Sequence, residues 1–370
     1  MRIAHLWVPE LDASKGGVQA FSHFLQQGLL RVEPAYHWRT FSRHSAHASS
    51  SSVWTPLFAA KLLWAGIRER PDLIIASHVN FLPAARLLKQ WCGTRYIGVA
   101  HGIEVWGAIR ASVRSALHEA DAIWAVSRYT RDRLRTDQGI SVERLAVLPN
   151  TFDEARFSPG PRPIGLAEQL GLPPKARVIF SVGRLAAAER YKGFDRVIAA
   201  LPQIRCSVPD VHYVIAGKGD DRQRLEALAR SLGVADRVSF AGFVPTEALC
   251  DYYRLCDVFA MPSTGEGFGI VFLEALACGK PVLAGNRDGS TDALADGRFG
   301  ALVDPLDVGE IGATLTSILK GTYAHPLMFE PEALRSQVVA EFGFERFARS
   351  LKTFLGDPRF GCQVAAPTCL

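Results

Sequence analysis

Short apolar runs alternate with helical patterns along this chain, and this alternation constrains its fold more than any other feature. Runs such as Leu73–Ala76 (LIIA) and 122–126 (AIWAV) are bounded by turn or polar residues, which is typical of strands buried on both faces of a parallel sheet. The pattern begins at Arg2–Val8 and restarts at 178–182. We therefore predict an α/β protein with two doubly wound, Rossmann-like parallel-sheet domains.

The domain boundaries follow from the segments between these patterns. The stretch 157–163 is rich in Pro and Gly and is predicted to be a linker. We expect a first domain at 1–160, a second at 161–340, and a C-terminal segment, 341–370, whose helix returns to the first domain. Ligands bind at the carboxyl ends of parallel strands, so two such domains facing each other would place their binding loops around a central cleft.

The composition argues against several other classes of protein. The chain of 370 residues contains seven Cys and no Cys-x-x-Cys, which disfavours a disulfide framework and a zinc ribbon. It also contains no Asp-x-Asp, and its His residues show no metal-ligand clustering, so we predict a reaction without a metal ion. No dinucleotide-binding Gly-x-Gly-x-x-Gly follows the first strand, which disfavours a dehydrogenase.

The N-terminus and the apolar segments bear on where the protein works. We find no signal peptide at the N-terminus, and the most apolar later stretch, 53–67, is too short to span a bilayer. A cytoplasmic protein is the expectation. Residues 1–150 carry 18 Lys and Arg against 11 Asp and Glu, and the rest of the chain carries 24 against 26. The basic half suggests an anionic partner, a lipid headgroup or a phosphorylated acceptor; ordinary solvated surface charge is the alternative.

One segment in the basic half has the composition of a membrane-surface helix. It is 54–70, in which Trp54, Phe58, Leu62 and Trp64 accompany basic residues. Such a helix would lie at the inner face of the cell membrane. A buried helix of the first domain is the simpler alternative.

The segment 261–281, MPSTGEGFGIVFLEALACGKP, is the most informative in the chain. Glu266 and Glu274 are eight residues apart, a spacing that a chain of this size contains by chance. Their setting is more specific, because a strand and a turn precede Glu266 and glycines then open a helix. Exposed amide N–H groups at such a helix start favour a phosphate or sugar oxygens.

This segment resembles the Glu-x7-Glu signature of the retaining glycosyltransferases of family 4. The segments SVGRL, YKGFD, AGKGDD and LPNTFD resemble further motifs of that family in the same order. The resemblance extends over roughly residues 1–355 and implies a GT-B architecture. In that architecture the first domain binds the acceptor and the second binds a nucleotide-sugar donor.

The resemblance also implies roles for residues of the second domain. Arg184 and Lys192 would bind the donor pyrophosphate and stabilise the charge of the leaving group. Glu266 would hold the sugar and Glu274 the ribose. The other donor-binding positions of this domain are Gly183, Gly217, Gly219, Gly267, Phe268, Gly269 and Ile270, and a tight turn is the alternative for Gly217 and Gly219. In the first domain Gly16 and Gly17 would lie close to the donor phosphates, and a plain turn is the alternative.

In the first domain the resemblance makes His101 a catalytic residue that contacts the donor sugar, where it would donate a hydrogen bond or a proton. A histidine with a purely structural role at the strand end is the alternative. Weaker candidates for acceptor binding are Glu104, Ser127 and Asn150. We interpret His5 and His78 as core histidines.

One loop departs from the pattern of the family. Many members have Gly-Gly-x-x-Glu after the strand that follows the Glu-x7-Glu helix. Here the loop 285–292 lacks the paired glycines, and Asp292 stands near the position of the Glu. The resemblance therefore does not extend to donor contacts from this loop.

The predicted activity is retaining, metal-independent transfer of a hexose to a glycan or lipid-linked acceptor in cell-surface polysaccharide biosynthesis. The donor is a nucleotide sugar, GDP-mannose before UDP-glucose, and we expect no cofactor and no nucleic-acid partner. The alternatives are a nucleotide-sugar 2-epimerase of the same fold and a non-catalytic sugar-nucleotide binding protein. Retention of all four charged residues, Arg184, Lys192, Glu266 and Glu274, disfavours the latter.

Overall fold

The chain forms two compact units in the computed structural model, which describes residues 2–13, 16–42 and 51–357, with only the backbone of 51–55. The first unit comprises Met1–Thr151 and Phe344–Leu370, and the second comprises Phe152–Gly343. The boundary differs from the predicted one, since 152–160 belongs to the second unit. The reason is Arg335, whose guanidinium donates hydrogen bonds to the backbone carbonyls of Glu154 and Phe157.

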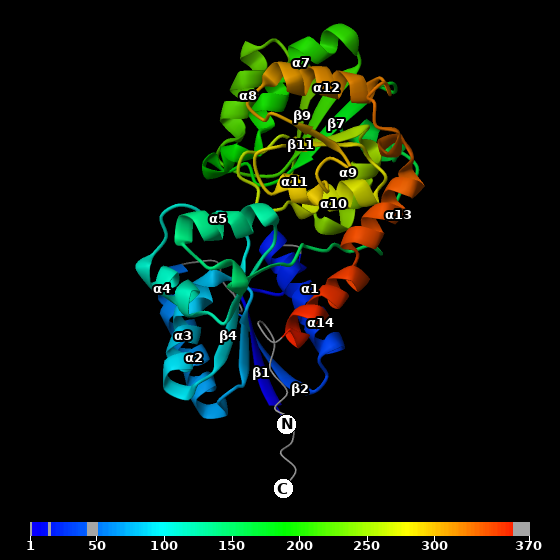
Figure 1. Cartoon of the computed structure of the whole chain (residues 1–370). Coiled ribbons are helices and arrows are strands. Elements are labelled where there is room, and N and C mark those ends of the chain that lie inside the picture. Colours follow the sequence, from blue (N-terminus) through cyan, green and yellow to red (C-terminus); the bar gives the residue numbers. More distant parts are fainter. Residues whose placement is uncertain (1, 14–15, 43–50, 358–370) are drawn as a thin grey trace. The chain divides into compact units, whose positions relative to one another are not determined.

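The first unit contains a six-stranded parallel sheet in the order β2-β1-β3-β4-β5-β6. Its strands are β1 Arg2–Val8, β2 Tyr36–Ser42, β3 Leu73–Ala76, β4 Arg95–Ala100, β5 Ala122–Ala125 and β6 Leu145–Val147. Helices cover both faces of this sheet (Figure 1). They are α1 Gly17–Val32, α2 Ser51–Glu69, α3 Leu82–Cys92, α4 Ala111–Glu119, α5 Arg128–Gln138 and α14 Phe344–Gly356.

The last helix, α14, packs on α1 in the first unit (Figure 1). Arg31 of α1 forms an ion pair with Glu345 at 2.6 Å, and the rings of Phe21 and Phe347 meet edge to face. Gly28 lies beneath Leu351, where a Cβ atom would lie 2.5 Å from a methyl group. The last described helix, α14, therefore belongs to the same unit as the first strand, β1.

The second unit contains a second six-stranded parallel sheet, in the order β12-β11-β10-β7-β8-β9. Its strands are β7 Arg177–Val182, β8 Val211–Ala216, β9 Val238–Gly242, β10 Val258–Met261, β11 Val282–Gly285 and β12 Ala301–Val303. Its helices are α6 Ile164–Gln169, α7 Phe194–Ser207, α8 Arg222–Ser231, α9 Thr246–Leu255, α10 Ile270–Ala277, α11 Ser290–Ala293, α12 Val308–Leu319 and α13 Pro331–Phe342.

Each face of this second sheet has its own core. Helices α7, α8 and α12 cover one face (Figure 1), where Ile179, Ile198 and Leu315 belong to one apolar cluster. Aromatic rings fill the other face, beneath α9 and α10, as in the contact of Tyr253 with Phe259. The prediction of two parallel-sheet α/β units is confirmed.

Two strands were missed in the sequence. Strand β2 (YHWRTFS) alternates buried and more exposed positions and lies at the edge of its sheet, so it lacks the continuous apolar run used to find the others. Strand β12 has three residues. The Ser- and His-rich segment 42–52 predicts a polar loop, but Ser42 ends β2 and 51–52 belong to α2. Residues 43–50 lie outside the described residues.

Candidate functional site

Four charged side chains form a row at the carboxyl ends of β7 and β10, which are neighbours in the second sheet. Arg184 Nη2 lies 2.5 Å from Glu189 Oε1. Lys192 Nζ lies 3.7 Å from Glu189 Oε2 and 3.3 Å from Glu266 Oε2. Cation and carboxylate thus alternate through the row Arg184, Glu189, Lys192, Glu266, which we call the charge row.

The members of the charge row differ in their access to solvent. The side chain of Arg184 is 78% exposed, whereas those of Glu189 and Lys192 are 10% and 13% exposed. Burial opposes the charge of Lys192, but the carboxylates of Glu266 and Glu189 outweigh that effect and raise its pKa. Lys192 is therefore a cation held inside the site, whereas Arg184 is accessible from solvent.

Glu189 was not predicted from the sequence, although it stands between the two predicted cations. It lies in the short 3₁₀ helix η4 (Ala187–Lys192). Among the described residues its buried Oε2 atom has no hydrogen-bond partner and is satisfied only by the more distant Lys192 ammonium. A carboxylate within a segment expected to bind phosphate was the signal that could have identified it.

Two of the predicted glycines, Gly217 and Gly219, have a packing reason. The chain segments that follow β7 and β8 lie so close together that a Cβ on Gly217 would lie 1.9 Å from the Gly183 carbonyl oxygen. One on Gly219 would lie 2.0 Å from the Leu185 carbonyl oxygen. Gly183 itself donates its N–H to the Ala216 carbonyl. These glycines shape the loops at the strand ends, and their contact with a donor remains a prediction.

Asp288 holds the loop that carries Glu266. Its Oδ2 accepts hydrogen bonds from the Glu266 N–H and the Ser263 hydroxyl, both at 2.7 Å. Its Oδ1 accepts the Ser290 N–H at 2.9 Å. Gly289 lies under the same loop, where a Cβ would lie 2.1 Å from the Gly267 carbonyl oxygen.

Asp288 is 1% exposed, and burial raises the pKa of its carboxyl to about 6. The loop 285–292, whose sequence differs from the family pattern, thus supports the predicted sugar-binding loop through the hydrogen bonds that Asp288 accepts. Sequence reasoning considered Asp292 in this loop and overlooked Asp288.

Glycines shape the start of α10. Gly269 has a φ of 90°, a value that L side chains rarely adopt, and it caps the helix. The ring of Phe268 is 1% exposed and packs edge to face on Phe342. Phe268 can therefore offer a ligand only its backbone, and the side chain of Ile270, 8% exposed, is also largely buried. Gly267 precedes them in the same buried turn.

Glu274 lies in the middle of α10 and is partly buried. Tyr253 of α9 donates its hydroxyl to Glu274 Oε2 at 2.7 Å. Burial raises the pKa of the Glu274 carboxyl to about 7, and the Tyr253 hydrogen bond offsets part of this increase. A carboxyl with one partner at neutral pH retains acceptor capacity for a ligand hydroxyl.

His101 follows β4 in the first unit. Its Nε2–H donates to the Ser77 carbonyl oxygen at 2.7 Å, and Phe21 packs edge to face against its ring. Burial lowers the pKa of His101. A neutral ring with Nε2–H committed to Ser77 leaves Nδ1 as an acceptor. Because Nε2–H already donates to Ser77, it cannot donate a hydrogen bond or a proton to the donor sugar in this arrangement, as the sequence led us to expect.

The loop after His101 is held at both ends. The carboxylate of Glu104 accepts the backbone N–H of His101, so Glu104 braces the loop. At the far end Gln138 Nε2 donates to the carbonyls of Val105 and Gly107 at 2.8 and 2.7 Å.

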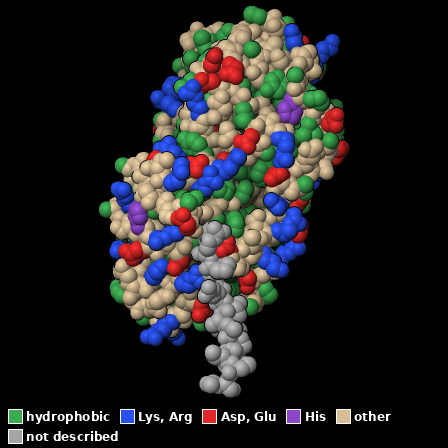
Figure 2. Space-filling view, in the orientation of Figure 1, with side chains coloured by type: hydrophobic (Ala, Val, Ile, Leu, Met, Phe, Trp, Pro, Cys, Tyr) green, Lys and Arg blue, Asp and Glu red, His purple; other side chains and the backbone are tan. Residues whose placement is uncertain are grey.

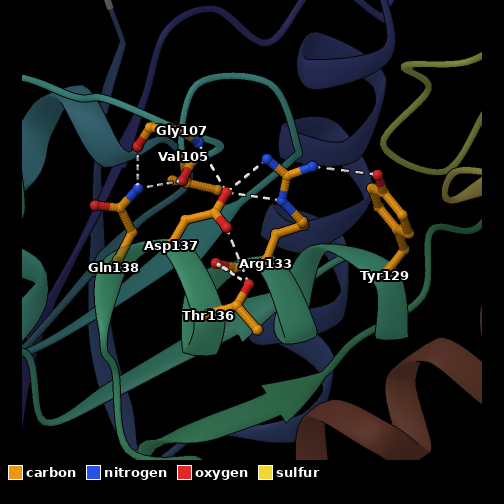
Figure 3. Close-up of polar contacts among 7 residues, drawn as sticks. All are labelled: Val105, Gly107, Tyr129, Arg133, Thr136, Asp137 and Gln138. Atoms are coloured by element: carbon orange, nitrogen blue, oxygen red, sulfur yellow. Dashed lines mark hydrogen bonds and ion pairs between the residues drawn. The ribbon is translucent and has the colours of Figure 1, made fainter.

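Asp137 completes this anchor by accepting the Gly107 N–H at 2.8 Å (Figure 3). The Gly107 amide lowers the pKa of Asp137, and Arg133 adds to the effect. Arg133 pairs with Asp137 at 2.6 Å and reaches the Tyr129 hydroxyl (Figure 3). Helix α5 thereby fixes the loop that carries His101.

Ser127 and Asn150, two weaker candidates in the first unit, differ in whether their polar atoms have hydrogen-bond partners. Ser127 is fully buried, and its hydroxyl caps α5 by accepting the Thr130 N–H, so a structural role accounts for it. Asn150 is 7% exposed, and among the described residues its Oδ1 has no hydrogen-bond partner. Gly16 and Gly17 are exposed at the start of α1.

The two histidines interpreted as core residues differ. His5 is fully buried and pairs with Glu69 at 2.9 Å, as expected. His78 is only partly buried and stacks on His101, with 6.1 Å between ring centroids. His78 therefore belongs to the same edge of the first sheet as His101, and its interpretation as a core residue was wrong.

The described residues lack two features that bear on metal binding and membrane insertion. Residues 2–13, 16–42 and 51–357 contain no group of three or more His, Cys, Asp or Glu side chains placed to hold a metal ion. Within the same residues, no helix has the length and apolar character needed to cross a membrane.

Two family models match the chain. The model of the glycosyl transferases group 1 matches residues 166–333. The model of glycosyltransferase family 4 matches residues 8–156. The two matches follow one another along the chain and together cover most of both units.

Several characterised proteins have similar sequences. A GDP-mannose-dependent alpha-(1-6)-phosphatidylinositol monomannoside mannosyltransferase of Mycolicibacterium smegmatis is 38% identical, over 82% of this chain and 86% of its own length. A D-inositol 3-phosphate glycosyltransferase of Acidothermus cellulolyticus is 35% identical, over 58% of this chain and 53% of its own.

Solved structures show the same fold. Sucrose-phosphate synthase from Thermosynechococcus elongatus superposes with a TM-score of 0.78 at 22% identity, covering 95% of this chain and 98% of that one. Anabaena HepE in complex with UDP and glucose superposes with a TM-score of 0.76 at 19% identity, covering 96% and 99%.

Proposed function

This chain belongs to the glycosyltransferases of family 4 and has their GT-B fold, and from that premise we propose that it transfers mannose from GDP-mannose to a lipid-linked glycan. The mannosyltransferase from Mycolicibacterium smegmatis, similar over most of both chains, supports this choice of donor. Its name also includes a phosphatidylinositol acceptor, which supports a glycolipid as the acceptor class.

The observation that carries the proposal is the charge row. The leaving group of a nucleotide-sugar reaction is a nucleoside diphosphate, whose negative charge grows as the glycosidic bond breaks. In the charge row Arg184 and Lys192 are neutralised by Glu189 and Glu266. We infer that the donor diphosphate replaces Glu189 as the partner of Arg184, while Lys192 stays in place as a fixed cation.

The neighbouring groups suit the rest of the donor. Glu266 and the amides at the start of α10 would hold the sugar, and Glu274 would accept hydrogen bonds from the ribose. Phe243, which follows β9, is 60% exposed. It lies beneath Lys218 at 6.0 Å and next to the close contact of Gly217 with Gly242. An exposed ring at the carboxyl edge of the sheet provides a stacking surface for the nucleobase.

The mechanism that we propose retains the configuration of the sugar and needs no metal ion. The departing phosphate would accept the proton of the acceptor hydroxyl. Arg184 and Lys192 would supply the main electrostatic stabilisation of the leaving group. Transfer should continue in EDTA, and the anomeric proton of the product should show the same configuration as the donor by NMR. Loss of transfer in EDTA that Mg²⁺ restores would contradict metal independence.

The Arg184→Ala variant tests the role of the charge row. We expect it to reduce transfer from GDP-mannose by about a hundredfold or more, since removing a group that stabilises transition-state charge has effects of this size. Arg205→Ala is the matched control, because Arg205 is an exposed arginine of α7 outside the site. Near-normal transfer by Arg184→Ala would remove Arg184 from the site.

Two further measurements separate the rival functions. A thermal-shift screen of GDP, UDP and their sugars should give the largest rise in melting temperature with the guanosine nucleotides, because a ligand that binds the folded state stabilises it. Incubating the protein with GDP-mannose and no acceptor should leave the sugar unchanged. An epimerised sugar would favour the 2-epimerase, and binding without transfer to any glycolipid acceptor would favour a non-catalytic protein.

We also propose that the first unit contacts an anionic membrane where the acceptor lies. Helix α2 exposes Leu57, Trp64 and Ile67, which are 58%, 62% and 48% exposed. The Arg68 guanidinium lies 5.2 Å from the Trp64 ring, and Lys61 is exposed on the same helix. Apolar rings beside cations suit the headgroup region of an anionic bilayer.

The details of this helix differ from the prediction. Leu62, named in the sequence as part of the membrane-contacting set, is 1% exposed, and Phe58 packs against the core of the first unit. The side chain of Trp54 lies outside the described residues. The basic excess of the first half does not form one field on the visible surface, where Lys and Arg side chains are interspersed with acidic ones (Figure 2).

A sedimentation assay tests the membrane contact. The chain should pellet at low salt with vesicles containing phosphatidylserine, and Trp64→Ala should weaken pelleting severalfold. The control is Ile164→Ala in α6, which removes a side chain that is 73% exposed in the second unit. Equal pelleting of Trp64→Ala and the unaltered chain would exclude this helix as the contact.

A further inference from the structure

Two buried cysteines lie next to each other in the second unit. Cys250 Sγ and Cys278 Sγ are 3.8 Å apart, and the two residues are 7% and 1% exposed. Cys250 belongs to α9, and Cys278 follows the last residue of α10. A disulfide requires about 2.05 Å between the sulfur atoms, so a small local movement would bring them to bonding distance.

The pair lies one helical turn from the contact between Tyr253 and Glu274. Tyr253 is three residues after Cys250 on α9, and Glu274 is four residues before Cys278 on α10. The Cys278 N–H also donates to the Glu274 carbonyl oxygen at 3.1 Å. The two sulfur atoms therefore connect the same two helices as the Tyr253 hydroxyl and the Glu274 carboxylate.

We propose that Cys250 and Cys278 are a reversible modification site, at which a peroxide oxidises the two thiols to a disulfide that links α9 to α10 and weakens nucleotide binding. The Cys250 thiolate attacks one oxygen of hydrogen peroxide, giving a sulfenic acid and a hydroxide that takes up a proton to become water. The Cys278 sulfur then displaces hydroxide from the Cys250 sulfur, and the Cys278 proton completes a second water. Two thiols and one peroxide thus give one disulfide and two waters, and a thiol reductant reverses the change.

The surroundings assign different roles to the two sulfur atoms. The hydrogen bond from the Cys278 thiol lowers the pKa of Cys250 to about 6, so Cys250 is the nucleophile. The same hydrogen bond, with burial, raises the pKa of Cys278, which suits the resolving thiol. A third cysteine, Cys256, donates to the Tyr253 carbonyl at 3.2 Å instead, and burial raises its pKa to about 12.

The effect on ligand binding follows from the geometry and rests on the proposed function of Glu274. The sulfur atoms must approach by about 1.7 Å to bond, and we expect the middle of α9, which carries Cys250, and the end of α10, which Cys278 follows, to move toward each other. Tyr253 and Glu274 lie one turn away, so their hydrogen bond and the orientation of the carboxylate change with them. If the reoriented Glu274 carboxylate loses one hydrogen bond to the ribose, the affinity for the nucleotide falls about tenfold.

Peptide mapping of the full chain tests whether the bond forms. After treatment with hydrogen peroxide and alkylation, digestion with trypsin and a glutamate-specific protease places the three cysteines on separate peptides. They are 248–254 for Cys250, 255–266 for Cys256 and 275–287 for Cys278. We expect a linked pair of 248–254 with 275–287 that dithiothreitol releases. A linkage through Cys256, or no linkage at concentrations that oxidise the exposed Cys206, would overturn the proposal.

Calorimetry with GDP tests the coupling. The oxidised chain should bind GDP about tenfold more weakly than the reduced chain, with recovery on reduction. Cys278→Ser should bind equally before and after peroxide, and Cys250→Ala serves if Cys278→Ser does not fold. Cys206→Ser is the control and should respond as the unaltered chain does. A linked chain with unchanged GDP affinity would overturn the coupling.

The two proposals fail in distinguishable ways. If the reduced chain binds no nucleoside diphosphate, the donor proposal is wrong, whereas the mapped disulfide still decides whether the modification site exists. In that case a change of melting temperature on oxidation, absent in Cys278→Ser, reports the link between α9 and α10.

Discussion

Replacing Glu274 by Gln should stabilise the second unit while weakening the binding of the nucleotide. In the protein without ligand the Glu274 carboxyl is partly buried, and among residues 2–13, 16–42 and 51–357 the Tyr253 hydroxyl is the one hydrogen-bond donor to its side chain. Gln has nearly the same shape, can accept the same hydrogen bond, and carries no charge to desolvate. The binding of ribose hydroxyls, by contrast, benefits from a charged acceptor.

The magnitude follows from the shift in the pKa of Glu274. Burial raises it from 4.5 to about 7, and a difference of about 2.5 pKa units corresponds to about 3 kcal/mol, an upper limit for the cost of ionising this carboxyl in the folded state. Because the folded pKa of this acid lies above its unfolded value, the cost is absent below about pH 4.5, grows as the pH rises to about 7, and is complete above it.

Chemical denaturation at several pH values measures this effect. At pH 8 the Glu274→Gln variant should unfold with a free energy up to about 3 kcal/mol greater than that of the unaltered chain, and at pH 4.5 the two should coincide. Calorimetry at pH 8 should show weaker binding of GDP by the variant, about tenfold. A variant that is less stable at pH 8, or whose gain is the same at both pH values, would refute the assignment of Glu274 as a buried carboxyl held for a ligand.

Three further changes address the supporting residues. Asp288→Asn offers one acceptor oxygen where two backbone N–H groups need one each, so denaturation should show a loss of about 2 kcal/mol, with a raised KM for the donor; an unchanged KM would separate Asp288 from the site. Glu189→Gln removes the counter-ion of Arg184 and should tighten GDP binding severalfold at low salt, and weaker binding measured by calorimetry would show that Glu189 positions Arg184 rather than competing with phosphate. Gln138→Ala releases the Val105 and Gly107 carbonyls and should lower kcat severalfold without changing GDP affinity, since GDP is assigned to the other unit; a parallel loss of GDP affinity would contradict that assignment.

Much of the fold followed from local patterns. Apolar runs such as LIIA and AIWAV correspond to β3 and β5, because strands buried on both faces need side chains that are apolar throughout. The edge strand β2 was missed for the converse reason. The position of α14 on the first unit depends on Phe347 and Leu351 meeting α1 residues, contacts that no local pattern records.

The candidate site was predictable to different degrees. Arg184, Lys192 and Glu266 were named from motifs, and the structure brings them into one row. Glu189 and Asp288 were not named. Asp288 acts through partners that are distant in the sequence, and Glu189 acts through two cations that only the folded loop brings together. Ser127 was named for its position after a strand and proved to be a helix cap.

Residue types at fixed spacings along the chain were enough to predict the two parallel sheets and the family. The folded arrangement was needed to show which charges neutralise one another, which carboxyls have raised pKa values, and which sulfur atoms meet. Those properties depend on distances between side chains from different strands and helices, and on how completely water is excluded around them. Neither quantity can be read from the order of residues along the chain.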